Sequence, residues 1–145
     1  MKRVIMSSTE SELQKCNAYV EKISRYLDIA KKKHLEYENT LGRREFGEFL
    51  EAVKSASREN VEFRLYIAKF EWGLRSGISS QDINYFLDIH DAFDAEISDD
   101  YDTLRRLQDE ARDRIAKKSA GSKMKKLKLT GSEQYAVEIA KQLMS

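Results

Sequence analysis

The sequence predicts an all-α protein: a long antiparallel helical hairpin of coiled-coil type, extended to a three- or four-helix bundle and followed by a short C-terminal helix. First, the 145 residues include no proline and only six glycines, the residues on which turn-rich β folds depend. Second, 35% of the residues are charged and 41% are hydrophobic, a mixture typical of amphipathic helices. Third, apolar residues recur in alternating steps of three and four, the spacing of helices that pack lengthwise on each other.

The first helix is expected from about Thr9 to Leu41, after a lead of residues 1–8. Thr9 and Glu12 have the spacing of a capping box at its start, and Gly42 is the expected stop. The apolar or semi-apolar positions of this helix are Leu13, Cys16, Val20, Ile23, Leu27, Ala30, His34, Tyr37 and Leu41.

A second helix repeats the pattern and is expected to end at Gly77. Since the connection around Gly42 is short, the first two helices should be antiparallel neighbours. Other apolar residues widen the stripe of the second helix, which predicts contact with more than one neighbour. The stripe itself is Phe46, Phe49, Val53, Ala56, Asn60, Phe63, Ile67, Phe70 and Leu74, and the widening residues are Leu50, Val61, Leu65, Ala68 and Trp72.

A third helix is expected to begin at Ser79 or Ser80. Its stripe is Ile83, Phe86, His90, Phe93 and Ile97. The next position of that pattern, Asp100, is polar, and the apolar pattern resumes one residue late, at Tyr101. The slip coincides with the run 98–100, Ser-Asp-Asp, whose residue types favour caps and turns. We therefore expect a break there, with a kink in a continuous helix as the alternative.

The end of the chain is expected to lie outside the bundle, which is assigned to residues 9–116. Residues 117–131 contain six lysines, two glycines and no acid, a composition typical of a linker or mobile tail. A final short helix is expected over 132–145, where Thr130 and Glu133 have the spacing of a capping box.

Motifs for catalysis or metal binding are weak, and we expect no catalytic residue, no cofactor and no metal. His34 and His90 both fall on apolar stripes, where a histidine at the edge of the core is the ordinary interpretation. Asp94 lies one helical turn after His90 and could share a metal ion with it, but the third ligand that a catalytic zinc site needs is missing. Cys16 lies in the helix seam, where a buried thiol behaves as a small hydrophobe.

The single cysteine, Cys16, cannot form an internal disulfide, which favours a reducing, cytoplasmic compartment. No stretch approaches the roughly 18 apolar residues of a membrane-spanning helix. The apolar part of residues 1–6 is too short for a signal peptide. We therefore expect no membrane span.

Charge is segregated along the chain, although its net value is only +1. No lysine or arginine lies between Arg75 and Arg105, and this span supplies a predicted acidic interaction face: Asp88, Asp91, Asp94, Glu96, Asp99, Asp100 and Asp102. No acid lies between Arg114 and Ser132, and this span supplies a predicted polyanion-binding segment: Lys117, Lys118, Lys123, Lys125, Lys126 and Lys128.

Three interpretations of this segregation stay open. Both regions can be solvated surface without a ligand. The lysine segment can dock on the acidic face, within one chain or in a second copy. Alternatively, the lysines can bind nucleic acid or lipid headgroups through their phosphates.

From these features we expect a non-catalytic protein–protein interaction module: an adaptor, a chaperone-like binder or an inhibitor that acts through helix faces. The two long stripes, together with Tyr19, Tyr26 and Trp72, offer more apolar surface than one hairpin covers, which predicts a homodimer. The alternative is a nucleic-acid-binding accessory protein, whose lysines contact phosphates without distinguishing base sequence.

Overall fold

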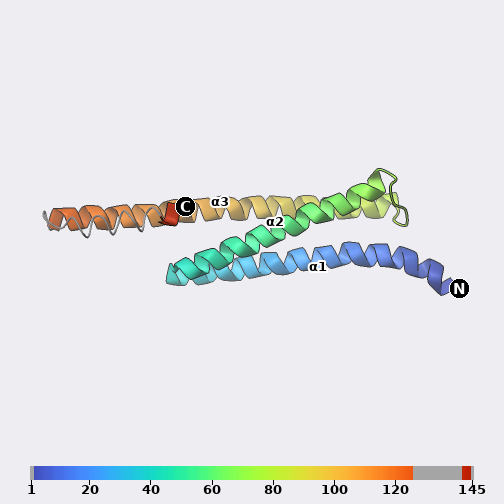
Figure 1. Cartoon of the computed structure of the whole chain (residues 1–145), viewed down its shortest axis with the longest axis horizontal. Coiled ribbons are helices and arrows are strands. Elements are labelled where there is room, and N and C mark those ends of the chain that lie inside the picture. The colour runs from blue at the N-terminus through green and yellow to red at the C-terminus, as the bar shows by residue number, and fades with distance from the viewer. Residues whose placement is uncertain (1, 126–141, 145) are drawn as a thin grey trace. The chain divides into compact units, whose positions relative to one another are not determined.

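The computed structural model describes residues 2–125 and 142–144, and within them it contains helices and no strand (Figure 1). Helix α1 spans Lys2–Thr40, α2 spans Arg43–Glu71 and α3 spans Ser80–Lys125. Side chains are described for residues 12–119 and 142–144. The predicted all-α class is confirmed. The chain divides into two compact units, Met1–Tyr101 and Asp102–Ser145.

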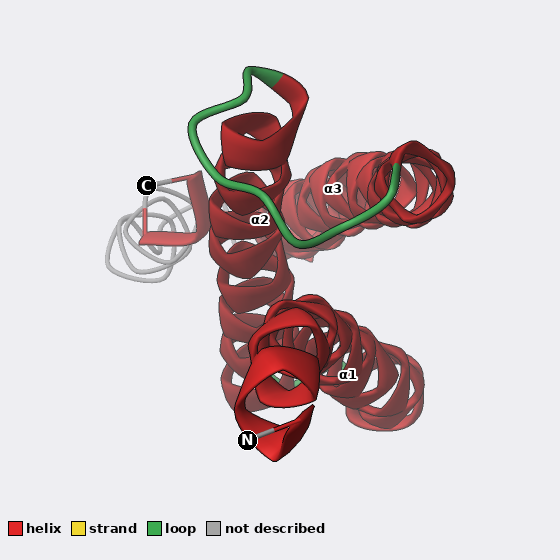
Figure 2. Cartoon of the chain, turned by 90° about the vertical axis from the view of Figure 1, so that its right-hand side faces the viewer, coloured by secondary structure: helices red, strands yellow, loops and turns green. Residues whose placement is uncertain are grey.

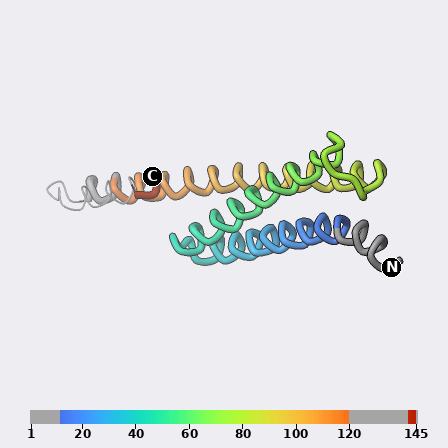
Figure 3. The backbone as a smooth tube through the Cα atoms, turned by 45° about the vertical axis from the view of Figure 1, so that its right-hand side comes forward, coloured from blue at the N-terminus to red at the C-terminus, as the bar shows by residue number. Residues whose placement is uncertain are grey.

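Helices α1 and α2 form the predicted antiparallel hairpin, which Figure 3 shows as a tube. Aromatic side chains join them along its length: the Tyr19 and Phe63 ring centroids lie 5.5 Å apart, and those of His34 and Phe49 lie 5.0 Å apart. The predicted stripes supply the buried seam. Its buried members are Cys16, Ile23, Leu27, Ala30 and Tyr37 from α1, and Phe49, Val53, Ala56, Asn60, Phe63, Ile67 and Phe70 from α2.

Within the first unit, the part of α3 up to Tyr101 packs on this hairpin. Figure 2 shows the helices end-on. The Phe86 ring meets the edge of Phe63 at a centroid distance of 6.1 Å. Helix α3 also contacts α1, because Lys31 Nζ of α1 lies 3.5 Å from Glu96 Oε1 of α3. The first unit is therefore a three-helix bundle, in which each helix contacts both others.

The start of the first helix differs from the prediction. α1 begins at Lys2, so the expected lead of residues 1–8 is helical from its second residue and Thr9 does not cap the helix. Residues 2–8 contain neither glycine nor proline, so nothing in them opposes extension of the helix.

The turn between α1 and α2 uses an unexpected residue. Leu41, not Gly42, has the left-handed conformation, with φ +51°, and its N–H donates to the Tyr37 carbonyl. Gly42 has an extended backbone and is the N-cap of α2. The Thr40 hydroxyl supports the turn, because its Oγ1 accepts a hydrogen bond of 3.2 Å from the Gly42 N–H.

The prediction that Gly77 ends the second helix is wrong, because α2 ends at Glu71. Gly73, with φ +73°, follows the C-cap residue Trp72 in the left-handed region. The Gly73 N–H donates to the Phe70 carbonyl and the Leu74 N–H to the Lys69 carbonyl, the hydrogen-bond pair of a Schellman motif. Leu74, expected in the buried stripe, is consequently 71% exposed.

The third helix begins as predicted but does not break. The Ser79 hydroxyl caps it by accepting a 3.1 Å hydrogen bond from the Asp82 N–H. The helix then continues through 98–100 to Lys125, so the expected break is wrong. Asp100 is a polar member of the seam and not the start of a new pattern. The helix keeps alternating steps of four and three through Phe86, His90, Phe93, Ile97, Asp100, Leu104 and Leu107, all of which are buried or half-buried.

The helical extent of α3 also corrects the predicted linker over 117–131. As far as Lys125 this segment is helix, because its lysines are good helix formers and one glycine does not stop the helix. Residues 142–144 are helical, in the region of the expected C-terminal helix; the rest of both segments, from 126 to 141, lies outside the described residues.

Candidate functional site

The residues of the predicted acidic interaction face point in three different directions around α3. Successive residues turn by about 100° around an α-helix, so Asp88, Asp91, Asp99 and Asp102 share one side, and all four are exposed. Asp102 belongs to the second unit, where its carboxylate lies 3.7 Å from Arg105 Nη2. The remaining members point elsewhere: Asp94 contacts α2, Glu96 contacts α1, and Asp100 is half-buried and feels the charges of Lys31 and His34 of α1.

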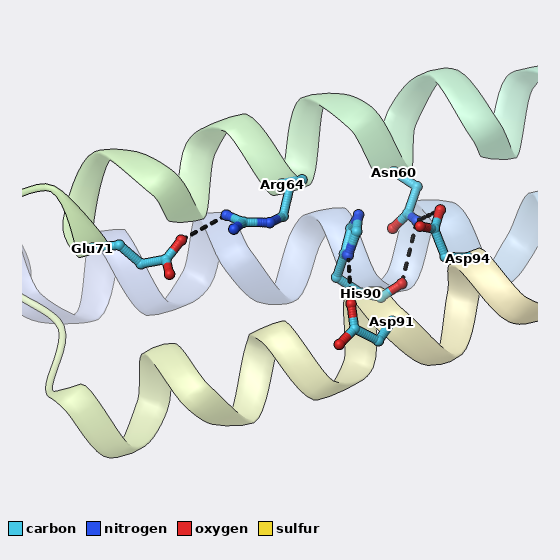
Figure 4. Close-up of polar contacts among 6 residues, drawn as sticks. All are labelled: Asn60, Arg64, Glu71, His90, Asp91 and Asp94. Carbon is cyan, nitrogen blue, oxygen red and sulfur yellow. Dashed lines mark hydrogen bonds and ion pairs between the residues drawn. The ribbon is translucent and has the colours of Figure 1, made fainter.

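Asp94 contacts a buried polar group of α2, as Figure 4 shows. Asn60 is only 1% exposed, and its Nδ2 donates to Asp94 Oδ1 over 3.1 Å and to the His90 carbonyl over 3.3 Å. Both partners are acceptors, so they fix the orientation of the amide. The Asn60 Oδ1 is buried with no hydrogen-bond partner among the described residues. This asparagine therefore joins α2 to α3 through two hydrogen bonds while one of its own polar atoms stays unpaired.

His90 completes the buried group on the α3 side. It is 8% exposed, and its Nδ1 lies 3.3 Å from Asp91 Oδ1 (Figure 4). Its ring lies 6.4 Å from that of Phe63. In the part of the chain that the structure describes, no group of three or more histidine, cysteine or acidic side chains is close enough to hold a metal ion.

Glu96 and Asp100 face α1. Glu96 pairs with Lys31, and Asp100 lies close enough to Lys31 and His34 for both to act on its charge. Burial, followed by the neighbouring Glu96 carboxylate, raises the pKa of Asp100. Its Oδ2 is buried and lacks a hydrogen-bond partner among the described residues. These acids therefore belong to the helix interface and not to a free acidic surface.

A second buried polar cluster, which the sequence did not reveal, joins Glu12 of α1 to the turn after α2. Glu12 is 8% exposed, and its two carboxylate oxygens are shared between Tyr66 and Arg75. The Tyr66 hydroxyl donates to Oε2, and Arg75 Nη2 donates to Oε1 over 3.2 Å. Burial and this hydrogen bond raise the pKa of Tyr66. Glu12 and Arg75 are 63 residues apart in the sequence, so the local spacing of residues could not predict their contact.

Cys16 lies one turn after Glu12 in the seam and is fully buried. Burial, with Glu12 as the next cause, raises the pKa of its thiol to about 11. The thiol is therefore protonated at neutral pH, which disfavours a nucleophilic role.

The predicted lysine segment is only partly within the described residues. Lys117 and Lys118 are exposed on α3, and Lys123 and Lys125 are helical at its end. Lys126 and Lys128 lie outside the described residues.

The largest departure from the predicted burial is an exposed apolar face on α2, here called the outer face: Val61, Leu65 and Trp72. Their exposed fractions are 56%, 55% and 74%. All three were expected to widen the buried stripe. Instead, α1 and α3 cover the opposite side of α2, where Phe63 and Ile67 are fully buried.

None of the described helices is long and apolar enough to cross a membrane. Comparison with family models, curated proteins and solved structures found no match to this chain.

Proposed function

We propose that this chain is a non-catalytic interaction protein, an adaptor, chaperone-like binder or inhibitor, that binds another polypeptide through a helix face. The observation that carries the proposal is the outer face of α2. Its three side chains share one side of the helix and are more than half exposed, whereas Phe63 and Ile67 on the opposite side are buried in the core. Exposed apolar residues gathered on one face, and not scattered singly, are typical of binding surfaces.

A cytoplasmic setting is part of the proposal. It is supported by Cys16, the single cysteine of the chain, which is a free and buried thiol.

Capture of binding partners by variants of the purified full chain tests this function. Leu65→Asp places a charge at the centre of the outer face, and Leu35→Asp makes the same change at a 66% exposed leucine of α1. The proposal predicts a partner that is retained by the wild type and by Leu35→Asp and lost by Leu65→Asp. Equal retention by both variants, with unchanged helix content in circular dichroism, would contradict binding through this face.

A second candidate function is sequence-independent binding of nucleic acid through the lysine segment. It is supported by the span from Arg114 to Ser132, which contains no acid, and by the exposure of Lys117 and Lys118. Each phosphate neutralised on duplex DNA contributes a slope of about −0.9 to log affinity against log salt. Replacement of Lys123, Lys125, Lys126 and Lys128 by glutamine should flatten that slope without changing helix content. No binding to DNA or RNA by the wild type at low salt would eliminate this candidate.

A further inference from the structure

The charges around the outer face of α2 form a pattern that complements itself. Leu65 is the centre of the face, and Arg58 and Trp72 lie seven residues before and after it, two turns away along the same line. Glu62 and Lys69, also seven residues apart, lie together on one side of this line. All of these side chains are exposed. The face from Arg58 to Trp72 is about 21 Å long at 1.5 Å per residue.

We propose that the outer face binds a second copy of this chain, with the two α2 helices antiparallel and a two-fold axis beside Leu65. This inference rests on the proposed function, since it names the partner of that same face. In such a pair, a residue that lies a given number of positions after Leu65 faces the residue the same number of positions before Leu65 in the other copy.

The antiparallel pairing places opposite or compatible groups together at every step. Leu65 meets Leu65 of the second copy. Trp72 falls opposite Arg58, whose guanidinium can stack on the indole ring. Lys69 falls opposite Val61 of the second copy and beside Glu62 of that copy. This follows because the two-fold axis keeps Glu62 and Lys69 of both copies on the same side of the seam. Each contact occurs twice, so the dimer gains two Glu62–Lys69 pairs and two Arg58–Trp72 pairs.

A parallel pairing of the same faces would bring like groups together. Arg58, which lies close to the centre line, would face Arg58 of the other copy, and like charges in contact are unfavourable. Glu62 and Lys69 would lie on opposite sides of the seam in the two copies, so the Glu62–Lys69 pairs would not form. The charge pattern therefore selects the antiparallel arrangement over the parallel one.

Charge reversal on the full-length protein tests both the partner and the arrangement. Glu62→Lys alone brings lysine against Lys69, and Lys69→Glu alone brings glutamate against Glu62, so each variant should dimerise roughly tenfold more weakly or worse. An equimolar mixture of the two single variants restores both pairs between unlike chains. The double variant restores them between like chains. Sedimentation velocity should show about twice the 16.9 kDa chain mass for the wild type, the mixture and the double variant.

Glu21→Lys is the matched control, because it reverses an exposed glutamate on α1 and should leave the dimer intact. Thermal denaturation followed by circular dichroism checks that each variant folds. A wild type that is monomeric at high micromolar concentration would overturn the inference. So would single variants that dimerise like the wild type, or a mixture and double variant that stay monomeric. If the wild type is monomeric but captures a different protein that the Leu65→Asp variant does not capture, self-association is rejected and the proposed function stands. The two failures are therefore distinguishable.

Discussion

Arg75 Nη2 lies 3.2 Å from Glu12 Oε1 and so joins the turn after α2 to α1. The same carboxylate accepts a hydrogen bond from Tyr66, and the Arg75 guanidinium lies over the Tyr66 ring at 5.7 Å. Glu12→Ala removes the shared acceptor and leaves the buried Tyr66 hydroxyl unpaired. We expect a loss of about 2–3 kcal/mol in the free energy of unfolding, measured by urea denaturation.

Lys15→Ala is the control for this cluster. Lys15 Nζ is 3.9 Å from the same Glu12 oxygen, but its side chain is half exposed. Its removal should cost less than about 0.5 kcal/mol, since exposed ion pairs contribute little. Similar losses for Glu12→Ala and Lys15→Ala would show that the buried cluster does not hold the turn.

Replacement of Leu41, whose backbone is left-handed, is predicted to stabilise the protein. A side chain at positive φ is strained by about 1–2 kcal/mol, and Leu41 is 49% exposed, so its replacement removes little buried area. Leu41→Gly should therefore raise the free energy of unfolding by about 1 kcal/mol. Gly73→Ala places a methyl group at φ +73° in open space and should lower it by about the same amount. Urea denaturation midpoints measure both, and a stabilising Gly73→Ala would refute the strain argument.

Asn60 predicts a contrast between two substitutions at one buried position. Asn60→Leu removes the unpaired Oδ1, while the exposed Asp94 carboxylate can be hydrated instead, so the free energy of unfolding should rise by about 1 kcal/mol. Asn60→Asp places a second carboxylate against Asp94 and the His90 carbonyl, and should lower it by about 3 kcal/mol. Thermal denaturation compares the two. A melting temperature that falls for both would show that the amide contributes net stability.

The hairpin could be predicted from the sequence because its information is local. Apolar steps of three and four fix which side of a helix is buried, and the short connection at Gly42 fixes the antiparallel neighbour. The helix ends were less accessible. Gly73 and Gly77 are equally suitable C-terminal residues in the sequence, and the hydrogen bonds to Phe70 and Lys69 that select Gly73 form only in the folded turn.

The face of a helix that stays exposed could not be predicted from the stripe alone. Val61 and Leu65 are as apolar as the buried Ile67, but two neighbouring helices cover only part of the circumference of α2. For the same reason, the sequence did not show which of the clustered acids of α3 stay exposed. Linear clustering of acids does not show that Asp94, Glu96 and Asp100 turn toward α2 and α1, because that depends on where those helices pack.

Asp100 shows how a polar seam residue makes stability depend on pH. The Asp100 pKa is raised by burial and by the carboxylates of Glu96 and Asp99, while Lys31 and His34 of α1 act in the opposite direction. Burial and the acidic neighbours prevail, so the folded pKa lies above the ordinary value of 3.8. A carboxyl whose pKa is raised by folding binds its proton more tightly in the folded state. Its contribution to stability is complete below the ordinary pKa and is lost as pH rises through the raised folded value.

Asp100→Asn should therefore stabilise the protein at neutral pH, because the neutral amide does not need to be ionised in a half-buried seam. At pH below 3.8, where the wild-type carboxyl is protonated, the difference between variant and wild type should disappear. Urea denaturation of both proteins across the acidic range measures this difference and cancels the titration of the other carboxyl groups. Asp88→Asn is the control, since Asp88 is an exposed aspartate of the same helix that does not act on the Asp100 carboxyl, and its change should leave the pH profile unaltered. A stability difference between Asp100→Asn and wild type that stays constant from acidic to neutral pH would show that the carboxyl charge is not its cause.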